Sequence, residues 1–198
     1  MNNTCCYSNS NVLDIDTTDS RPTSLVTVKE CIFSDNILGD TAVIGSTGYQ
    51  GNSLIIDRSV FKNNLVSDGR RVAIWYSGGI LNILNSNFSN NEIANNLNGG
   101  AIYVDVTYFN STILISNCHF NGNVASGFGG AIFASQVLIS ITNSSSINNK
   151  VISSSGFGGA IFASHVNITI TNTIFIDNSA GSTSGYGGAV FVHRMEKL

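Results

Sequence analysis

A phrase of the form F-x-x-N recurs along the chain, and this internal repeat constrains the fold more than any other feature. Its spacing ranges from 26 residues (positions 120 to 146) to 32 residues (positions 88 to 120). The first position of the phrase is held by Phe33, Phe61, Phe88, Phe120, Ser146 and Phe175. A repeat this short cannot bury an apolar face alone, so we expect successive repeats to stack on one another.

Each repeat contains further apolar phrases that are typical of short strands. Aliphatic residues stand five and seven positions before each anchor, as Ile115 and Ile113 do before Phe120. Alternation at a spacing of two predicts a strand with one buried face. An Ala-Ile-aromatic phrase comes earlier, as in residues 131–133, and a Gly pair introduces it from Gly99 onward. We therefore expect about three short strands per repeat, separated by Gly or Asn turns.

Stacked repeats of this kind predict an all-β protein, a right-handed parallel β-helix (solenoid) of about six coils with a pectate-lyase-like superfold. The strand spacing of roughly 4.8 Å would place equivalent side chains above one another and form a continuous core. The right hand follows from the general rule for parallel crossovers. A propeller blade needs four strands in about 40 residues, and an ankyrin or leucine-rich repeat needs a helix that this composition does not favour.

The fourth position of the repeated phrase is always Asn, which predicts an asparagine ladder. A stacked carboxamide can donate a hydrogen bond to one neighbour and accept one from the other. We expect the ladder to consist of Asn36, Asn64, Asn91, Asn123, Asn149 and Asn178. A second column lies three residues before the anchors and consists of Asn85, Asn117, Asn143 and Asn172.

The repeat defines the expected boundaries of the solenoid. Residues 24–192 form the parallel β-helix, residues 1–23 a polar leader or partial N-terminal coil, and residues 193–198 a truncated tail. The Ser- and Gly-rich stretches 124–128, 153–157 and 179–186 are expected to be loops. We also expect the chain to be part of a longer protein, because an uncapped solenoid end exposes strand edges.

The composition excludes several classes of protein. The formal net charge of −3 and the low content of charged residues (11%) argue against a nucleic-acid-binding protein, which would carry a basic stripe. No apolar run is long enough for a transmembrane segment, and the first residues lack the pattern of a signal peptide.

The charged residues inside the repeats predict structural pairing and no catalysis. In the proposed register Lys29 stacks on Asp57 and Glu30 stacks on Arg58, one coil apart. The same two columns carry only neutral residues in the later coils. A polysaccharide lyase would need carboxylates there, so no catalytic residue is assigned and the chain is not expected to be an enzyme.

No metal or cofactor site is expected either. The D-x-D-x-x-D pattern at residues 14–19 lacks the Gly and Glu of a calcium loop, and the three His residues fall in different columns. Cys31 and Cys118 share a column three coils apart, too far for a disulfide, and are expected to be small core residues. Cys5 and Cys6 lie in the leader.

An aromatic column offers a possible partner-binding face. Strand alternation places these residues opposite an aliphatic column, so one of the two columns faces the core and the other faces out. We favour the arrangement with the aliphatic residues inside, which would form an exposed apolar ridge of the kind that marks interaction surfaces. The ridge would consist of Trp75, Tyr103, Phe133 and Phe162, continued by Phe191.

The combination of G-G-A-I and F-x-x-N phrases over residues 24–192 resembles the repeats of chlamydial polymorphic outer membrane proteins. Right-handed β-helix surface proteins of other bacteria and of protists look similar. The resemblance implies a non-enzymatic, surface-displayed or secreted module of the adhesin or autotransporter-passenger type. It would be extracellular, on the cell surface or at the outer membrane. Its loops and one strand face would meet a host or self surface protein or a glycan.

Two alternatives remain open at the level of the sequence. The first is a carbohydrate-active β-helix, similar to polysaccharide lyases or hydrolases, or a glycan-binding one; an acid beside Asp177 would favour it. The second is an ice- or surface-binding protein, because Ser140, Thr142, Thr169 and Thr171 lie on one outer face.

Overall fold

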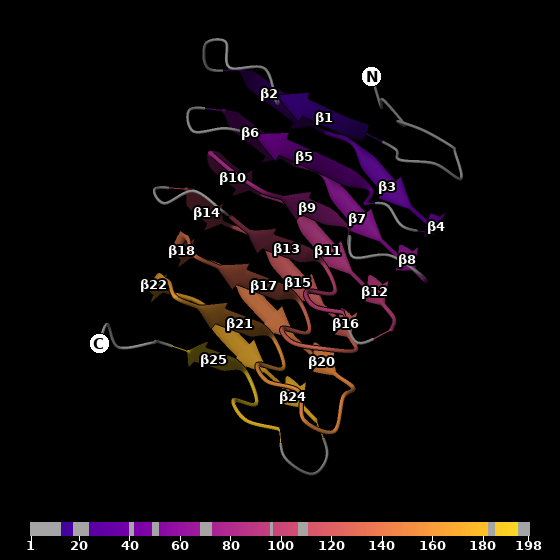
Figure 1. Cartoon of the computed structure of the whole chain (residues 1–198), viewed down its shortest axis with the longest axis vertical. Helices are drawn as coiled ribbons and strands as arrows, with labels where there is room; N and C mark the ends of the chain where they lie inside the picture. Colours follow the sequence, from indigo (N-terminus) through magenta and orange to yellow (C-terminus); the bar gives the residue numbers. More distant parts are fainter. Residues whose placement is uncertain are drawn as a thin grey trace.

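The computed structural model describes residues 13–17, 24–39, 42–48, 52–67, 73–95, 97–106, 111–181 and 185–193. All regular secondary structure in these ranges is β-strand. The strands follow one another along a single axis, from β1 and β2 at one end to β24 and β25 at the other (Figure 1). Within the described ranges, no helix is long and apolar enough to cross a membrane.

The strands form four parallel sheets. Sheet A consists of β1 (Leu13–Thr17), β5 (Ile44–Gly48), β9 (Ile74–Tyr76), β13 (Ile102–Asp105), β17 (Ile132–Ser135), β21 (Ile161–Ser164) and β25 (Val190–His193). Sheet B consists of β2 (Leu25–Lys29), β6 (Ser53–Asp57), β10 (Ile80–Leu84), β14 (Thr112–Ser116), β18 (Leu138–Thr142) and β22 (Asn167–Thr171).

Shorter strands form the other two sheets. Sheet C consists of β3 (Ile32–Ser34), β7 (Val60–Lys62), β11 (Asn87–Ser89), β15 (His119–Asn121), β19 (Ser145–Ile147) and β23 (Ile174–Ile176). Sheet D consists of β4 (Ile37–Leu38), β8 (Leu65–Val66), β12 (Glu92–Ile93), β16 (Val124–Ala125), β20 (Lys150–Val151) and β24 (Ser179–Ala180).

The topology confirms the predicted parallel β-solenoid. Each strand pairs with its equivalents one coil before and one coil after, in the register given by the repeat: Phe88, for example, lies between Phe61 and Phe120. The described chain makes about five full turns between the first and last strands of its six-stranded sheets, close to the predicted six coils. The expectation of three strands per repeat was wrong, because sheet D adds a fourth. Its strands begin in stretches such as 124–128 that were expected to be loops.

Alternation along each strand places one set of residues in the interior. In β14, Ile113 and Ile115 are both 1% exposed, whereas Leu114 between them is 41% exposed. Burying an aliphatic side chain of this size contributes roughly 1.5–3 kcal/mol. Because the same residue type recurs in each layer, the interior is a set of continuous columns.

The anchor phenylalanines form one of these columns, in sheet C. The rings of Phe33, Phe61, Phe88 and Phe120 stack with centroid distances of 4.8, 4.8 and 4.9 Å. This spacing equals that of the strands, so each ring covers the face of the next. At Ser146 the stack is interrupted, and a cavity of about 10 Å³ lies there, lined among others by Phe120 and Phe175.

The asparagine ladder is present as predicted. Along it each side-chain Nδ2 donates to the Oδ1 of the asparagine one coil later; Asn91 donates in this way to Asn123 at 2.9 Å. The main-chain N–H of Asn91 donates to the same Oδ1 at 3.1 Å. Its Nδ2 also donates to Phe61 O at 3.0 Å, so the buried amide is fully hydrogen-bonded. The other ladder contacts join Asn36 to Asn64, Asn64 to Asn91, Asn123 to Asn149 and Asn149 to Asn178 at 2.7 to 2.9 Å.

A second ladder runs through the small residues two positions before the anchors. The hydroxyl of Ser144 accepts from the main-chain N–H of Cys118 at 3.1 Å and donates to Thr142 O at 2.8 Å. Ser59 and Ser86 make the same two kinds of contact. Of this column, Cys31 and Cys118 were expected to be small core residues; the hydroxyls of the column also satisfy main-chain N–H groups inside the solenoid.

The turns between sheets use left-handed backbone conformations. Asn117 has φ 54° at the turn between sheets B and C, and its equivalents Asn85, Asn143 and Asn172 have φ between 48° and 50°. Asn tolerates this region better than most residues. The exposed side chains in these turns form looser contacts, such as Asn117 Nδ2 to Asn85 Oδ1 at 3.2 Å.

The Gly pairs allow close approach between coils. Gly129 has φ 64°, a conformation that favours glycine. A Cβ on Gly130 would lie 2.1 Å from the carbonyl oxygen of Gly159 in the next coil. The pair is therefore required where the chain enters β13, β17 and β21 of sheet A.

Several sequence-based interpretations lie wholly or partly outside the described residues. These are the leader apart from β1, the tail after residue 193, Cys5, Cys6, Asp19, and the side chains of Asp14 and Asp16. β1 itself pairs with β5 in sheet A.

Neighbouring substitutions in β14 test the assignment of inner and outer faces. Ile115→Asp buries an unpaired charge, so we expect the free energy of unfolding to fall by about 4 kcal/mol or more. Leu114→Asp should change it by less than about 1 kcal/mol, because that side chain is exposed. Urea unfolding followed by circular dichroism would measure both; equal effects would contradict the face assignment.

A matched pair of Asn→Asp variants tests the ladder. Asn123→Asp removes two donors and places a carboxylate in the interior, which should cost about 3–5 kcal/mol at pH 7. The variant should regain part of this stability in acid, because protonation removes the buried charge. Asn117→Asp changes an exposed turn residue and should cost less than about 1 kcal/mol. Equal stability of the two variants at pH 7 would argue against a ladder that stabilises the fold.

Candidate partner-binding face

The aromatic column lies on the outer face of sheet A. Ile102, Ile132 and Ile161 are buried in the interior. The residues that follow them, Tyr103, Phe133 and Phe162, point to the opposite side of the strands. The structure thus has the aliphatic residues inside and the aromatic residues outside.

The outer aromatic rings stack along the solenoid axis. The centroid distances are 4.9 Å between Tyr103 and Phe133, 5.3 Å between Phe133 and Phe162, and 5.6 Å between Phe162 and Phe191. The interplanar angles are 7°, 5° and 14°. Parallel offset stacks of this kind contribute about 0.5–1.5 kcal/mol per pair beyond the area that they bury.

A second aromatic column covers the first, and the sequence interpretation missed it. It consists of Phe128, Phe157 and Tyr186, each directly before a Gly pair. Phe128 stacks on Phe157 at 5.4 Å, and Phe157 stacks on Tyr186 at 5.6 Å. In the sequence, this column could have been found from the aromatic residue that recurs at the first position of the phrase x-G-G-A. In the preceding coil this position is Asn98, whose Oδ1 accepts from the main-chain N–H of Phe128 at 2.8 Å.

Residues of the second column also contact the outer aromatic residue of the following coil. Phe128 contacts Phe162 at 5.0 Å, and Phe157 contacts Phe191 at 4.8 Å. Phe162 is covered by Phe128, and Phe133 is stacked between Tyr103 and Phe162, so each is only 9% exposed. The prediction of an exposed ridge was therefore wrong at these two positions, because neighbouring rings cover them. Tyr186 is 63% exposed. We use the name aromatic face for the surface formed by Trp75, Tyr103, Phe128, Phe133, Phe157, Phe162, Tyr186 and Phe191.

The aromatic face is uncharged over most of its length. Asp105 borders it at one end, where the hydroxyl of Tyr103 donates to the Asp105 carboxylate at 3.3 Å. Stacking covers the faces of the rings with neighbouring rings, so the solvent meets mainly ring edges. An apolar, uncharged surface with polar groups at its margin is typical of a protein–protein contact.

The charged cluster at the first two coils is an ion-pair network. Arg58 contacts Glu30 at 2.7 Å, which confirms the predicted pair, and contacts Asp57 at 3.5 Å. Lys29 lies opposite Asp57 in the register, as predicted. Asn85 Nδ2 also donates to Asp57 at 2.9 Å. Exposed pairs of this kind contribute about 0–1 kcal/mol, and their geometry indicates a structural role.

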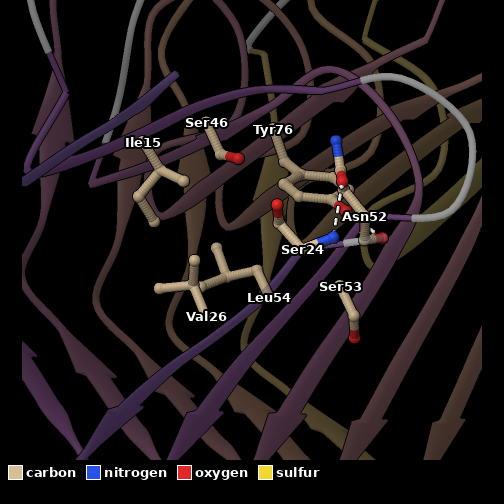
Figure 2. A pocket seen from close by; sticks show the side chains of 8 residues that line it. All are labelled: Ile15, Ser24, Val26, Ser46, Asn52, Ser53, Leu54 and Tyr76. Carbon is tan, nitrogen blue, oxygen red and sulfur yellow. Dashed lines mark hydrogen bonds between the residues drawn. The ribbon is translucent and has the colours of Figure 1, made fainter. Parts of the chain in front are cut away.

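The pocket between sheets A and B near the N-terminal end of the described residues offers little room for a ligand. Figure 2 shows this pocket, which is lined by residues of both sheets, among them Tyr76 of sheet A and Leu54 of sheet B; the ring of Tyr76 points toward Asn52. Its volume is about 10 Å³, roughly enough for one water molecule. The Tyr76 hydroxyl donates to Ile80 O at 3.0 Å, and burial raises the pKa of this tyrosine. The pocket is a packing defect, too small for a substrate.

Potential metal ligands and nucleophiles are scattered. Within the described ranges, no group of three or more His, Cys, Asp or Glu side chains lies together. Asp177 is exposed in a turn with φ 51°. The thiol of Cys31 donates to Lys29 O at 3.3 Å, and that of the buried Cys118 donates to Ser116 O at 3.2 Å. Asn63 Nδ2 donates to Asp35 at 2.9 Å and lowers the pKa of that carboxyl.

The comparisons with known proteins agree with the repeat. Residues 117–135 match the model of the Chlamydia polymorphic membrane protein repeat. These residues include the anchor Phe120, the ladder Asn123, the aromatic Phe128 and the Gly pair that follows it. The match confirms the resemblance predicted from the F-x-x-N and G-G-A-I phrases.

A curated relative is the "Probable autotransporter YfaL" of Escherichia coli (strain K12). It is 36% identical over an alignment of 153 residues, which covers 67% of this chain. The chain spans 12% of the relative's length. No solved structure matches the chain.

Titration of Cys118 provides a test of the core around the thiol. Burial raises the pKa of this thiol to about 11. The thiol of the unfolded chain therefore loses its proton at a lower pH than the thiol of the folded chain. The free energy of unfolding is highest below about pH 9 and falls as the pH rises toward the pKa of the folded chain. Cys118→Ser keeps the hydrogen bonds that Ser86 and Ser144 make in the same column.

Between pH 8.5 and 10.5 we expect the natural chain to lose about 2 kcal/mol more stability than Cys118→Ser. Urea unfolding under reducing conditions would measure the difference. Tyr76 is present in both proteins, so its own titration cancels. Equal losses in the two proteins would show that the thiol is not buried.

Proposed function

We propose that the chain is a non-enzymatic β-solenoid module displayed on a cell surface or at the outer membrane, where its aromatic face binds a partner protein. The names of the two matches, a polymorphic membrane protein repeat and a probable autotransporter, support surface display. The stacked aromatic face is the observation that carries the binding role.

The aromatic face supports binding because it is apolar and rigid. Its residues are fixed by stacking between coils, as Phe157 is by Tyr186 on one side and Phe128 on the other. Little conformational entropy would be lost when a partner immobilises them. Aromatic residues also dominate the energetics of protein interfaces.

A protein partner fits this surface better than a glycan. A sugar ring binds an aromatic side chain through the open face of the ring, and here the ring faces of Phe133 and Phe162 are covered by their neighbours. At these two positions only ring edges remain open, which suits apolar side chains of another protein. A protein-binding aromatic face would give the chain an adhesin role toward a host or self surface protein.

A surface-labelling experiment tests the first part of the proposal. An antibody raised against the purified chain should label intact cells of the source organism as strongly as permeabilised cells. Labelling that requires permeabilisation would contradict surface display.

A binding experiment tests the second part. Beads coated with the chain are incubated with arrays of surface proteins, with glycan arrays, and with beads that carry the chain itself. The double variant Phe157→Ser/Tyr186→Ser should reduce binding to protein at least tenfold, the loss expected for interface hot spots.

The matched control is Ile37→Ser/Ile174→Ser, which removes aliphatic side chains that are 66% and 58% exposed on sheets D and C. This control should bind normally. Equal loss in the two double variants would place the binding surface elsewhere, and binding confined to the glycan arrays would favour a glycan-binding module.

A further inference from the structure

The outer face of sheet B exposes aliphatic side chains on a surface separate from the aromatic face. Leu25, Ile80, Leu114 and Leu138 are 65%, 41%, 41% and 47% exposed. Each strand of the sheet presents three outward side chains, which the register arranges in three columns. From β2 to β18 the first column consists of Leu25, Ser53, Ile80, Thr112 and Leu138, the second of Thr27, Ile55, Asn82, Leu114 and Ser140, and the third of Lys29, Asp57, Leu84, Ser116 and Thr142.

Apolar and polar side chains alternate on this face in two directions. Along the second column Leu114 lies between Asn82 and Ser140. Along β10 the order is apolar, polar, apolar, as Ile80, Asn82 and Leu84 show. Strands at equal distances before and after β10 carry the same kinds of side chain, polar-apolar-polar in β6 and β14 and apolar-polar-polar in β2 and β18. The pattern is therefore symmetrical about Asn82.

Asn82, at the centre of this pattern, has an unused acceptor. Within the described ranges, its side-chain Oδ1 is buried and has no hydrogen-bond partner. Its outward neighbours along β10 are Ile80 and Leu84, and those in the adjacent strands are Ile55 and Leu114. None of these side chains carries a donor, and a buried acceptor without a partner destabilises the structure. A donor from another molecule would remove this penalty.

We propose that the outer face of sheet B is the interface of a two-fold symmetric dimer. A second copy of the chain would pack on it face to face, with the two solenoid axes antiparallel and Asn82 opposite Asn82 of the second copy. The two-fold axis lies along β10, so β14 meets β6 of the second copy and β18 meets β2. An interface of this symmetry must be complementary to itself, which the pattern about Asn82 fulfils.

This arrangement brings the aliphatic residues of the two copies together. Leu114 would meet Ile55 of the second copy, and Leu138 would meet Leu25. Ile80, like Leu84 beside it, would meet its own equivalent. The aliphatic side chains that are exposed on the single chain would thus be removed from water in pairs.

The two Asn82 side chains can satisfy each other in the dimer. Sheets that pack face to face lie about 10 Å apart, a distance that two asparagine side chains span end to end. The terminal torsion of asparagine is soft, so the amide can turn its oxygen toward the second copy. Each Nδ2 would then donate to the Oδ1 of the other copy. A polar pair of this kind within an apolar contact also fixes its register.

The charged residues favour the antiparallel arrangement. Lys29 would face Thr142 of the second copy, and Asp57 would face Ser116, so each charge meets a hydroxyl group and no like charges meet. A parallel arrangement, with the two-fold axis along the solenoid, would instead place Lys29 against Leu25. The apolar pairing at the edge of the interface would then be lost.

The size of the face predicts a weak dimer. The five facing strands of each copy, spaced about 4.8 Å apart and about 17 Å long, cover roughly 400 Å² of flat area. The two copies together would bury roughly twice this area, which is the size of weak, transient interfaces. We therefore expect a dissociation constant of about 10–100 μM.

Analytical ultracentrifugation tests the dimer and its surface. Between about 1 and 300 μM the natural chain should show monomers in equilibrium with dimers. Leu114→Asp should raise the dissociation constant at least tenfold, because it places a charge opposite Ile55 of the second copy. The matched control Ile174→Asp changes an aliphatic residue that is 58% exposed on sheet C and should leave the constant unchanged.

A natural chain that stays monomeric over this range would overturn the proposal. Equal weakening by Leu114→Asp and Ile174→Asp would also contradict it. A dimer that is lost in Phe157→Ser/Tyr186→Ser but kept in Leu114→Asp would assign self-association to the aromatic face instead of sheet B.

The pH dependence of Asn82→Asp tests the central pair. At pH 7 two carboxylates would meet, so this variant should dimerise at least tenfold more weakly than the natural chain. At about pH 4 a protonated carboxyl group can donate to the other, so the dimer should return. Asn87→Asp, an exposed position on sheet C, should dimerise like the natural chain at both pH values. A loss in Asn82→Asp that does not depend on pH would show that the two side chains do not meet.

Cross-linking tests the antiparallel orientation. In a background with Cys5, Cys6 and Cys31 replaced by Ser, a short bismaleimide should join Leu25→Cys chains to Leu138→Cys chains in a mixture. Leu25→Cys chains alone should not be joined, because four strand spacings of about 4.8 Å separate the two equivalent positions. Cross-links between Leu25→Cys chains alone would contradict the antiparallel dimer.

Discussion

The hydrogen bonds between equivalent residues of successive coils are the constraint on which the rest of the structure depends. A buried carboxamide that lost its partners would cost about 1–3 kcal/mol, so each ladder asparagine fixes the coil before it and the coil after it in register. Once Asn91, Asn123 and Asn149 are aligned, the Phe stack and the aliphatic columns align as well. The aromatic face on sheet A is a consequence of the same register.

The sequence predicted those parts of the fold that repeat with little variation. The ladder and the Phe column could be found because one residue type occupies the same position in almost every coil. Sheet D was missed because strands of two residues, such as Val124–Ala125, are too short to show alternation. The hydroxyl ladder was missed because Cys118, Ser144 and Thr173 share a hydrogen-bonding role without sharing a residue type.

The candidate binding face was predicted only in part. The column from Trp75 to Phe191 follows from strand alternation, but alternation alone leaves open which side is inside. The structure has the aliphatic residues inside and adds Phe128, Phe157 and Tyr186 from the turns that enter sheet A. Contacts of this kind join residues about 34 positions apart, as in Phe128 to Phe162. The x-G-G-A phrase marks the aromatic residue but does not indicate which distant ring it contacts.

The one-way direction of the asparagine ladder gives the solenoid an electrical polarity. Hydrogen bonds within a parallel sheet point in alternating directions and leave little net dipole. The six ladder amides instead point the same way, so their dipoles add, with the positive pole at Asn178 and the negative pole at Asn36. Each amide polarises the next, which strengthens the bonds cooperatively. A growing column of this kind favours addition at its ends over breakage in its middle.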